Sequence, residues 1–119
     1  DQKLARRLQA PRQARKGLSQ AEQYLQQENQ KLFYDTLFKT LQHYFASKFH
    51  LTTGIGSFQA LESLIVSRKL NSGISEKLKR IFEECEHVRY ASWPSDPAEM
   101  KANYELTQEI IDFFERNWK

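Results

Sequence analysis

One stretch of the sequence, NQKLFYDTLFKTLQHYFASKF at positions 29–49, constrains the fold more than any other. Its apolar residues recur at the three- and four-residue spacing of one helix face. They are Leu32, Phe33, Leu37, Leu41, Tyr44, Phe45 and Phe49, with Tyr34 and Phe38 widening the face. Asn29 is a suitable N-cap, and Lys39, Gln42 and Lys48 are expected on the opposite side. So wide an apolar face predicts a central helix that several neighbours cover.

Four other segments carry helical periodicity together with start or stop signals. They are 19–27, 57–70, 75–90 and 97–118. The first begins with a capping box of Ser19 and Glu22, and the second has Ser57 as its cap. The third restarts at Ser75 after the Asn-Ser-Gly break at 71–73, and the fourth has Asp96 as N-cap and Pro97 as its first helical residue. No stretch alternates with the period of two that a strand requires. The prediction is an all-α protein, a compact irregular bundle of about five helices.

The first 17 residues, DQKLARRLQAPRQARKG, differ in composition from the rest. Pro11 is expected to interrupt any helix here and Gly17 to end the segment. The sequence therefore divides into a basic arm, residues 1–17, which is interpreted as a linker or a loosely held helix, and a helical domain, residues 18–119. The basic arm carries six cations, Lys3, Arg6, Arg7, Arg12, Arg15 and Lys16.

Charge is distributed unevenly between these two parts. The six cations stand against Asp1 alone, a balance of +5, which leaves −2 for the remainder of a chain whose net charge is +3. The cations are not interleaved with aromatic residues, so the pattern is poor for nucleic-acid recognition. A basic segment lying beside an anionic membrane surface explains the arm as well or better.

The octapeptide EECEHVRY at 83–90 contains the only cysteine, Cys85, and a nearby histidine, His87. Residues two apart on a helix point about 200° away from each other, so these two cannot share a metal ion or a proton. Cys85 is expected in the core and His87 at the surface. His43 and His50 are seven positions apart and lack the spacing of a metal pair. The sequence thus predicts no catalytic residue, no metal or cofactor site, and a protein that is not an enzyme.

Three stretches together resemble a known family. They are FYDTLFKTLQHYFASKFHL (33–51), GIGSFQALESLI (54–65) and EECEHVRYAS (83–92), the last followed by Met100, Tyr104 and an amphipathic terminal helix. The combination is similar to the C-terminal cytosolic domain of the BatD family of the aerotolerance-associated Bat operons, over residues from about 18 to 117. Ser92 stands where that pattern usually has proline.

The resemblance implies a soluble interaction domain at the cytoplasmic face of the inner membrane, in a parent protein that is membrane-anchored and linked to oxygen or stress tolerance. The basic arm would then lie just inside the membrane. Implied partners are von Willebrand-type proteins, tetratricopeptide proteins and MoxR-type ATPases. The family brings no catalytic residues to transfer.

The expected interaction surface lies around Arg89, Tyr90 and Trp93, since such a Tyr–Trp–Arg group is typical of binding hot spots. In the alternative interpretation, Tyr90 and Trp93 pack the last helix against the bundle. A second hypothesis for the whole protein is a nucleic-acid-binding helical adaptor that uses the basic arm.

Overall fold

The computed structural model describes residues 2–50, 63, 66, 72–91 and 94–117, with only the backbone described at 3, 6, 72 and 91. These residues form four helices and no strand, which confirms the all-α prediction. The helices are α1 (Gln2–Gln26), α2 (Gln30–Phe49), α4 (Ser72–Ala91) and α5 (Pro97–Asn117). The helix expected at 57–70 falls almost wholly outside the described residues. None of the described helices is long and apolar enough to span a bilayer.

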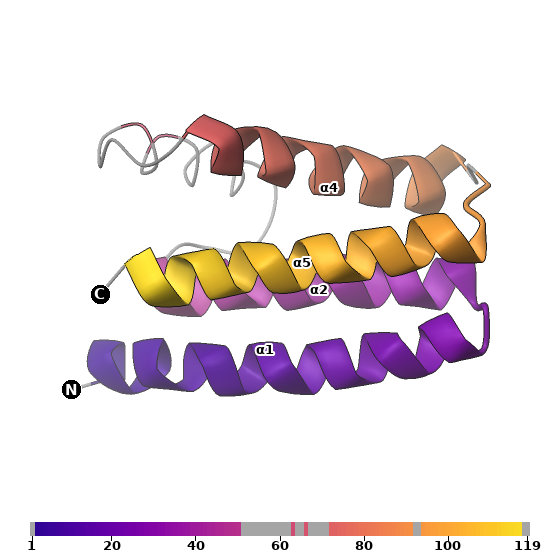
Figure 1. Ribbon diagram of the computed structural model, residues 1–119. Helices are drawn as coiled ribbons and strands as arrows, with labels where there is room; N and C mark the ends of the chain where they lie inside the picture. The colour runs from indigo at the N-terminus through magenta and orange to yellow at the C-terminus, as the bar shows by residue number, and fades with distance from the viewer. Residues whose placement is uncertain (1, 51–62, 64–65, 67–71, 92–93, 118–119) are drawn as a thin grey trace.

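The four helices lie side by side in a bundle, with neighbours along the chain running in opposite directions (Figure 1). Helices α2 and α5 contact each other, and each also contacts both α1 and α4. Helices α1 and α4 therefore lie on opposite sides of the bundle. Helix α1 begins, and helices α2 and α5 end, at the same end of it (Figure 1).

The predicted central helix is confirmed as α2. Most of its expected apolar face is buried, and Phe49 packs against the core from a partly exposed position. Two expectations for this helix are wrong. Leu32 is 40% exposed because it lies in the first turn, at the edge of the bundle. Lys48 is only 7% exposed, and an acidic partner on α5 accounts for its burial.

The helix termini follow the predicted capping chemistry at two places. The Asn29 side chain accepts a hydrogen bond from the Leu32 amide at 3.2 Å, and Asp96 accepts one from the Glu99 amide at 2.8 Å. Pro97 opens α5 as expected. Helix α4 begins at Ser72 and not at Ser75, because glycine and serine are tolerated in a first turn.

Two expectations for the N-terminal segment are wrong: Pro11 does not interrupt the helix, and Gly17 does not end it. Pro11 and Gly17 both lie inside α1, which runs without interruption from Gln2 to Gln26, and Ser19 is a mid-helix residue with no capping role. A proline inside a helix removes one backbone hydrogen bond and crowds the preceding turn. Burial along the same helix offsets this cost, since Ala10, Ala14 and Leu18 all belong to the core cluster.

Small residues explain how α1 approaches the bundle so closely. Ala10, Ala14, Gly17 and Ala21 are three or four positions apart, so they share one helix face, and the three alanines are at most 1% exposed. A side-chain carbon at Gly17 would collide with the Thr40 side chain on α2. Thr40 has little freedom to turn away, because its hydroxyl donates to the Thr36 carbonyl at 2.7 Å. Gly17 is therefore a close-approach residue, not a helix end.

This contact yields a first prediction. Replacing glycine by alanine in an exposed helix interior stabilises it by about 1 kcal/mol. At Gly17 we expect the opposite sign, a loss of about 1–3 kcal/mol in the free energy of unfolding, because the added carbon overpacks the α1–α2 contact. Urea unfolding followed by circular dichroism measures the change.

The matched controls are Ser19→Ala, at an exposed position of the same helix, and Gly17→Ala combined with Thr40→Ala. The first is expected to be neutral or stabilising, and the second to recover most of the loss. A Gly17→Ala variant at least as stable as the natural protein would contradict the close packing of α1.

Candidate functional site

Arg89, the first residue of the expected interaction surface, lies near the end of α4, and its side chain contacts α2. Its Nε donates to Asp35 Oδ1 at 2.7 Å, in a partly buried ion pair. Its guanidinium carbon lies 4.3 Å from the centre of the Phe38 ring and 5.2 Å from that of Tyr90. An ion pair and two cation–π contacts thus fix the guanidinium between two aromatic rings.

Tyr90 is the most exposed large hydrophobic residue of the described chain, at 76%. The interpretation in which Tyr90 packs the last helix against the bundle is therefore wrong, because the side chain points to solvent beside Arg89. Trp93, the third expected member, lies outside the described residues. The structure consequently brings together two of the three predicted residues and adds Asp35 and Phe38, which the sequence did not single out.

A hydrogen-bond network holds the neighbouring α4–α5 connection against α2. The Tyr34 hydroxyl lies 2.8 Å from Ser95 Oγ, and Asn103 Nδ2 donates to the same hydroxyl at 2.8 Å. The Ser95 amide in turn donates to Gln30 Oε1 at 2.9 Å. Burial raises the pKa of Tyr34, so this hydroxyl stays protonated. The backbone that follows Tyr90 is thus attached to the core a few residues later.

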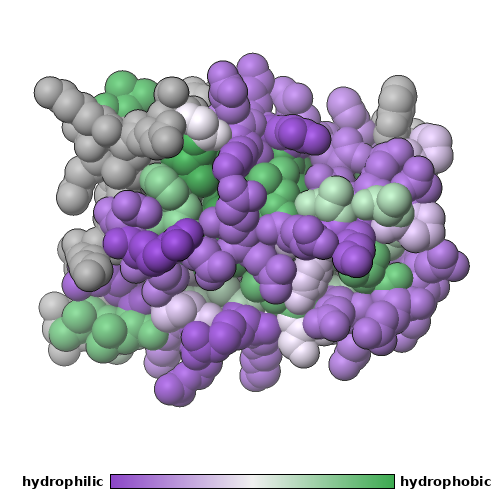
Figure 2. All heavy atoms as spheres, viewed as in Figure 1, coloured by the Kyte–Doolittle hydropathy of each residue, from purple (hydrophilic) through white to green (hydrophobic). Residues whose placement is uncertain are grey.

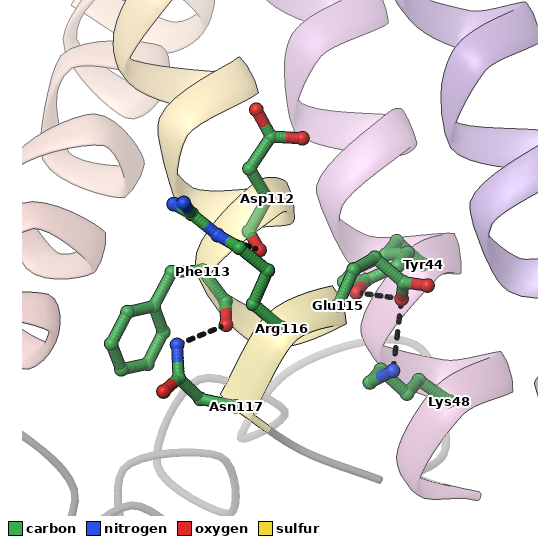
Figure 3. Close-up of polar contacts among 7 residues, drawn as sticks. All are labelled: Tyr44, Lys48, Asp112, Phe113, Glu115, Arg116 and Asn117. Carbon is green, nitrogen blue, oxygen red and sulfur yellow. Dashed lines mark hydrogen bonds and ion pairs between the residues drawn. The ribbon is translucent and has the colours of Figure 1, made fainter.

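A second polar cluster lies at the opposite end of the bundle, where α2 and α5 end (Figure 3). Tyr44 and Lys48 on α2 both point to Glu115 on α5. The Tyr44 hydroxyl donates to Glu115 Oε2 at 2.5 Å, and Lys48 Nζ donates to the same oxygen at 2.8 Å. Tyr44 is fully buried and Lys48 nearly so, so this carboxylate satisfies two buried donors.

The protonation of this cluster follows from its surroundings. Burial opposes the charge of Glu115, but the hydrogen bonds from Lys48 and Tyr44 and the charges of Lys48 and Arg15 outweigh it and lower the pKa of this carboxyl. Burial and the adjacent carboxylate raise the pKa of Tyr44. At neutral pH the Tyr44 hydroxyl therefore keeps its proton and Glu115 is a carboxylate. The hydrogen bonds of Tyr44 and Lys48 both end on a carboxylate of the same protein, which is the arrangement of a structural cluster.

The spacing of Lys48 in the sequence indicated its burial, although its charge suggested a surface position. Lys48 lies four positions after Tyr44 and eleven after Leu37, so spacing alone places it on the buried face of α2. Because Lys48 is charged, its residue type predicts the exposed face instead. The acidic partner on α5 is 67 residues further along the chain, too far for any local pattern to reveal.

Cys85 is fully buried in the core cluster, as predicted. Burial raises its pKa to about 12, so the thiol is neutral and shielded from reagents in the folded protein. His87 is exposed, also as predicted, and His43 and His50 lie at the surface of α2 and at its C-cap. Within the described residues there is no group of three or more histidine, cysteine or acidic side chains suited to a metal.

The cations of the basic arm lie on α1. Arg7, Arg12, Arg15 and Lys16 are exposed, and the side chains of Lys3 and Arg6 are outside the described set. A groove of about 460 Å³ separates the outer surfaces of α1 and α2. The residues that line it include Gln13, Gln20, Thr36, Lys39 and His43.

Neither a family model, nor a curated protein, nor a solved structure matches this chain.

A second prediction concerns Glu115. Its replacement by alanine is expected to lower the free energy of unfolding by about 1–3 kcal/mol, since Lys48 and Tyr44 lose their acceptor while remaining buried. Because folding lowers the pKa of Glu115, the ion pair stabilises the fold above the ordinary carboxyl range. That stabilisation is lost as the pH falls through the folded-state pKa. Urea titrations at several pH values measure both effects.

The matched control is Glu109→Ala, which removes the exposed ion pair between Lys77 on α4 and Glu109 on α5. A surface pair contributes about 0–1 kcal/mol, so this variant is expected to unfold nearly as the natural protein does. Equal losses in the two variants would contradict the distinction between a buried cluster and a surface pair.

Proposed function

We propose that this protein is a non-catalytic interaction domain whose binding surface is centred on Arg89 and Tyr90. The observation that carries the proposal is the exposure of Tyr90 beside a guanidinium that is already fixed in place. Tyrosine and arginine are enriched among the residues that dominate binding energy.

Preorganisation supports the same assignment. Arg89 is held by Asp35 and stacks on Phe38, so little side-chain freedom remains to be lost when a partner binds. The network of Tyr34, Ser95 and Asn103 restrains Ser95, five residues after Tyr90. A partner would therefore meet a surface already close to its bound geometry.

The resemblance to the BatD family supplies the proposed setting. In that setting the domain belongs to a membrane-anchored protein linked to oxygen or stress tolerance, and it lies at the cytoplasmic face of the inner membrane with the basic arm nearest the lipid. The proposed partners are the von Willebrand-type, tetratricopeptide and MoxR-type ATPase proteins of the same systems. This part of the proposal rests on the quoted sequence stretches.

The third prediction tests the surface. We expect Tyr90→Ala to weaken binding to at least one of these purified partners by about tenfold or more, the range of a hot-spot residue. Thermal stability should change little, because the ring is exposed and its cation–π contact with Arg89 lies at the surface. Isothermal titration calorimetry of each partner against the natural and variant domains measures the affinity.

Lys79→Ala is the matched control, because Lys79 is also exposed on α4 and lies eleven residues, about three helical turns, before Tyr90 on the same face. It is expected to bind as the natural protein does. The proposed surface fails if Tyr90→Ala binds every tested partner normally, or if Lys79→Ala weakens binding as much.

A further inference from the structure

The N-terminal half of α1 leaves two leucines facing solvent. Leu4 is 46% exposed and Leu8 is 67% exposed. In the space-filling view, apolar atoms reach the surface at the lower left, over the first turns of α1 (Figure 2). Leucines four positions apart on a helix form one continuous surface. Core packing does not account for them, because α1 turns its alanines inward.

The helix arranges basic residues along the same exposed surface. At 100° per residue, Leu4, Leu8, Arg12 and Arg15 fall within about 80° of one another, and each lies about 80–160° from the buried Ala10 and Ala14. Over about 17 Å this outer stripe places two leucines ahead of two arginines. Arg7 and Lys16 flank it and are also exposed.

No negative charge interrupts this surface along the helix. Between Gln2 and Ala21, α1 contains six basic residues and no acidic one. Arg15 already has an acidic neighbour, Glu115 of α5, so an anionic partner would be met mainly by Arg7, Arg12 and Lys16, with the leucines beside them.

We propose that the outer stripe of α1 docks on an anionic lipid surface, with Leu4 and Leu8 inserted at the boundary between headgroups and acyl chains. The helix lies flat on the membrane, and Arg7, Arg12, Arg15 and Lys16 contact the headgroups. Long basic side chains reach the headgroup phosphates while their aliphatic stems stay beside the leucines. Each cation near such a surface adds to the electrostatic attraction.

The shape of the surface favours a bilayer over a folded protein as the partner. The stripe is the convex outer side of a helix, and a protein would need a complementary groove to cover it. A bilayer accepts a convex helix without one. The two leucines distinguish this docking from simple adsorption by charge, which the cations would provide without them.

The test measures binding of the full chain to phosphatidylcholine vesicles that contain phosphatidylserine, against vesicles of phosphatidylcholine alone. The natural protein should co-sediment with the anionic vesicles only, and less so at high salt. Leu4→Ser combined with Leu8→Ser should lower the partition coefficient by about tenfold or more, because two apolar side chains no longer enter the interface. Arg12→Glu combined with Lys16→Glu should lower it by a similar factor.

Two controls are matched for chemistry but lie elsewhere. Leu32→Ser removes an exposed leucine of α2, and Lys79→Glu with Arg80→Glu reverses two exposed cations of α4. Both are expected to bind vesicles nearly as the natural protein does. Circular dichroism establishes that each variant is folded, which the exposure of all these positions predicts.

Three results would overturn the proposal. They are unchanged vesicle binding by the leucine variant, an equal loss in the α4 charge variant, and binding to duplex DNA that is tighter than binding to vesicles. This inference rests on the proposed membrane-proximal position of the basic arm. Its failure remains distinguishable from failure of the interaction surface, because Tyr90→Ala should bind vesicles normally and the leucine variant should bind protein partners normally.

Discussion

The close packing of α1 through small residues is the constraint on which the rest of the structure depends. Ala10, Ala14, Gly17 and Ala21 bring the α1 backbone against the bundle, and Gly17 leaves no room for a side chain beside Thr40. A helix packed through alanine and glycine must place its larger residues elsewhere. The leucines and arginines of the N-terminal half consequently face outward, where they form the proposed lipid-docking stripe.

Charged side chains then tie α2 to its neighbours at two separate places. The buried cluster of Tyr44, Lys48 and Glu115 joins the ends of α2 and α5, and Arg89 with Asp35 joins the end of α4 to the start of α2. Desolvation offsets much of the attraction in a partly or wholly buried ion pair, although removing one partner alone is strongly destabilising. The first cluster satisfies its own donors within the protein. The Arg89–Asp35 pair has the exposed ring of Tyr90 beside it, and we therefore assign the binding surface to this site.

The sequence predicted what depends on periodicity and on local chemistry. The all-α class, the central helix at 29–49, the Asn29 and Asp96 caps and the buried Cys85 all follow from spacing within one segment, and all are confirmed. It failed where packing overrides local preference. Pro11 and Gly17 read as helix breakers, yet tertiary contacts keep both within α1. Lys48 and Arg89 owe their positions to carboxylates 67 and 54 residues away, which no local pattern shows. The resemblance, and the function it implies, remains a proposal.

Hydrogen exchange of the backbone amides in α1 tests the central claim most directly. If Ala10, Ala14 and Gly17 dock the helix into the bundle, the amides of residues 14–21 should be protected to nearly the same free energy as those in the middle of α2. The first turn should exchange faster, as a helix terminus does. Exchange at unfolded-chain rates throughout residues 10–18, while α2 stays protected, would contradict this account. It would show that the segment is not packed on the bundle.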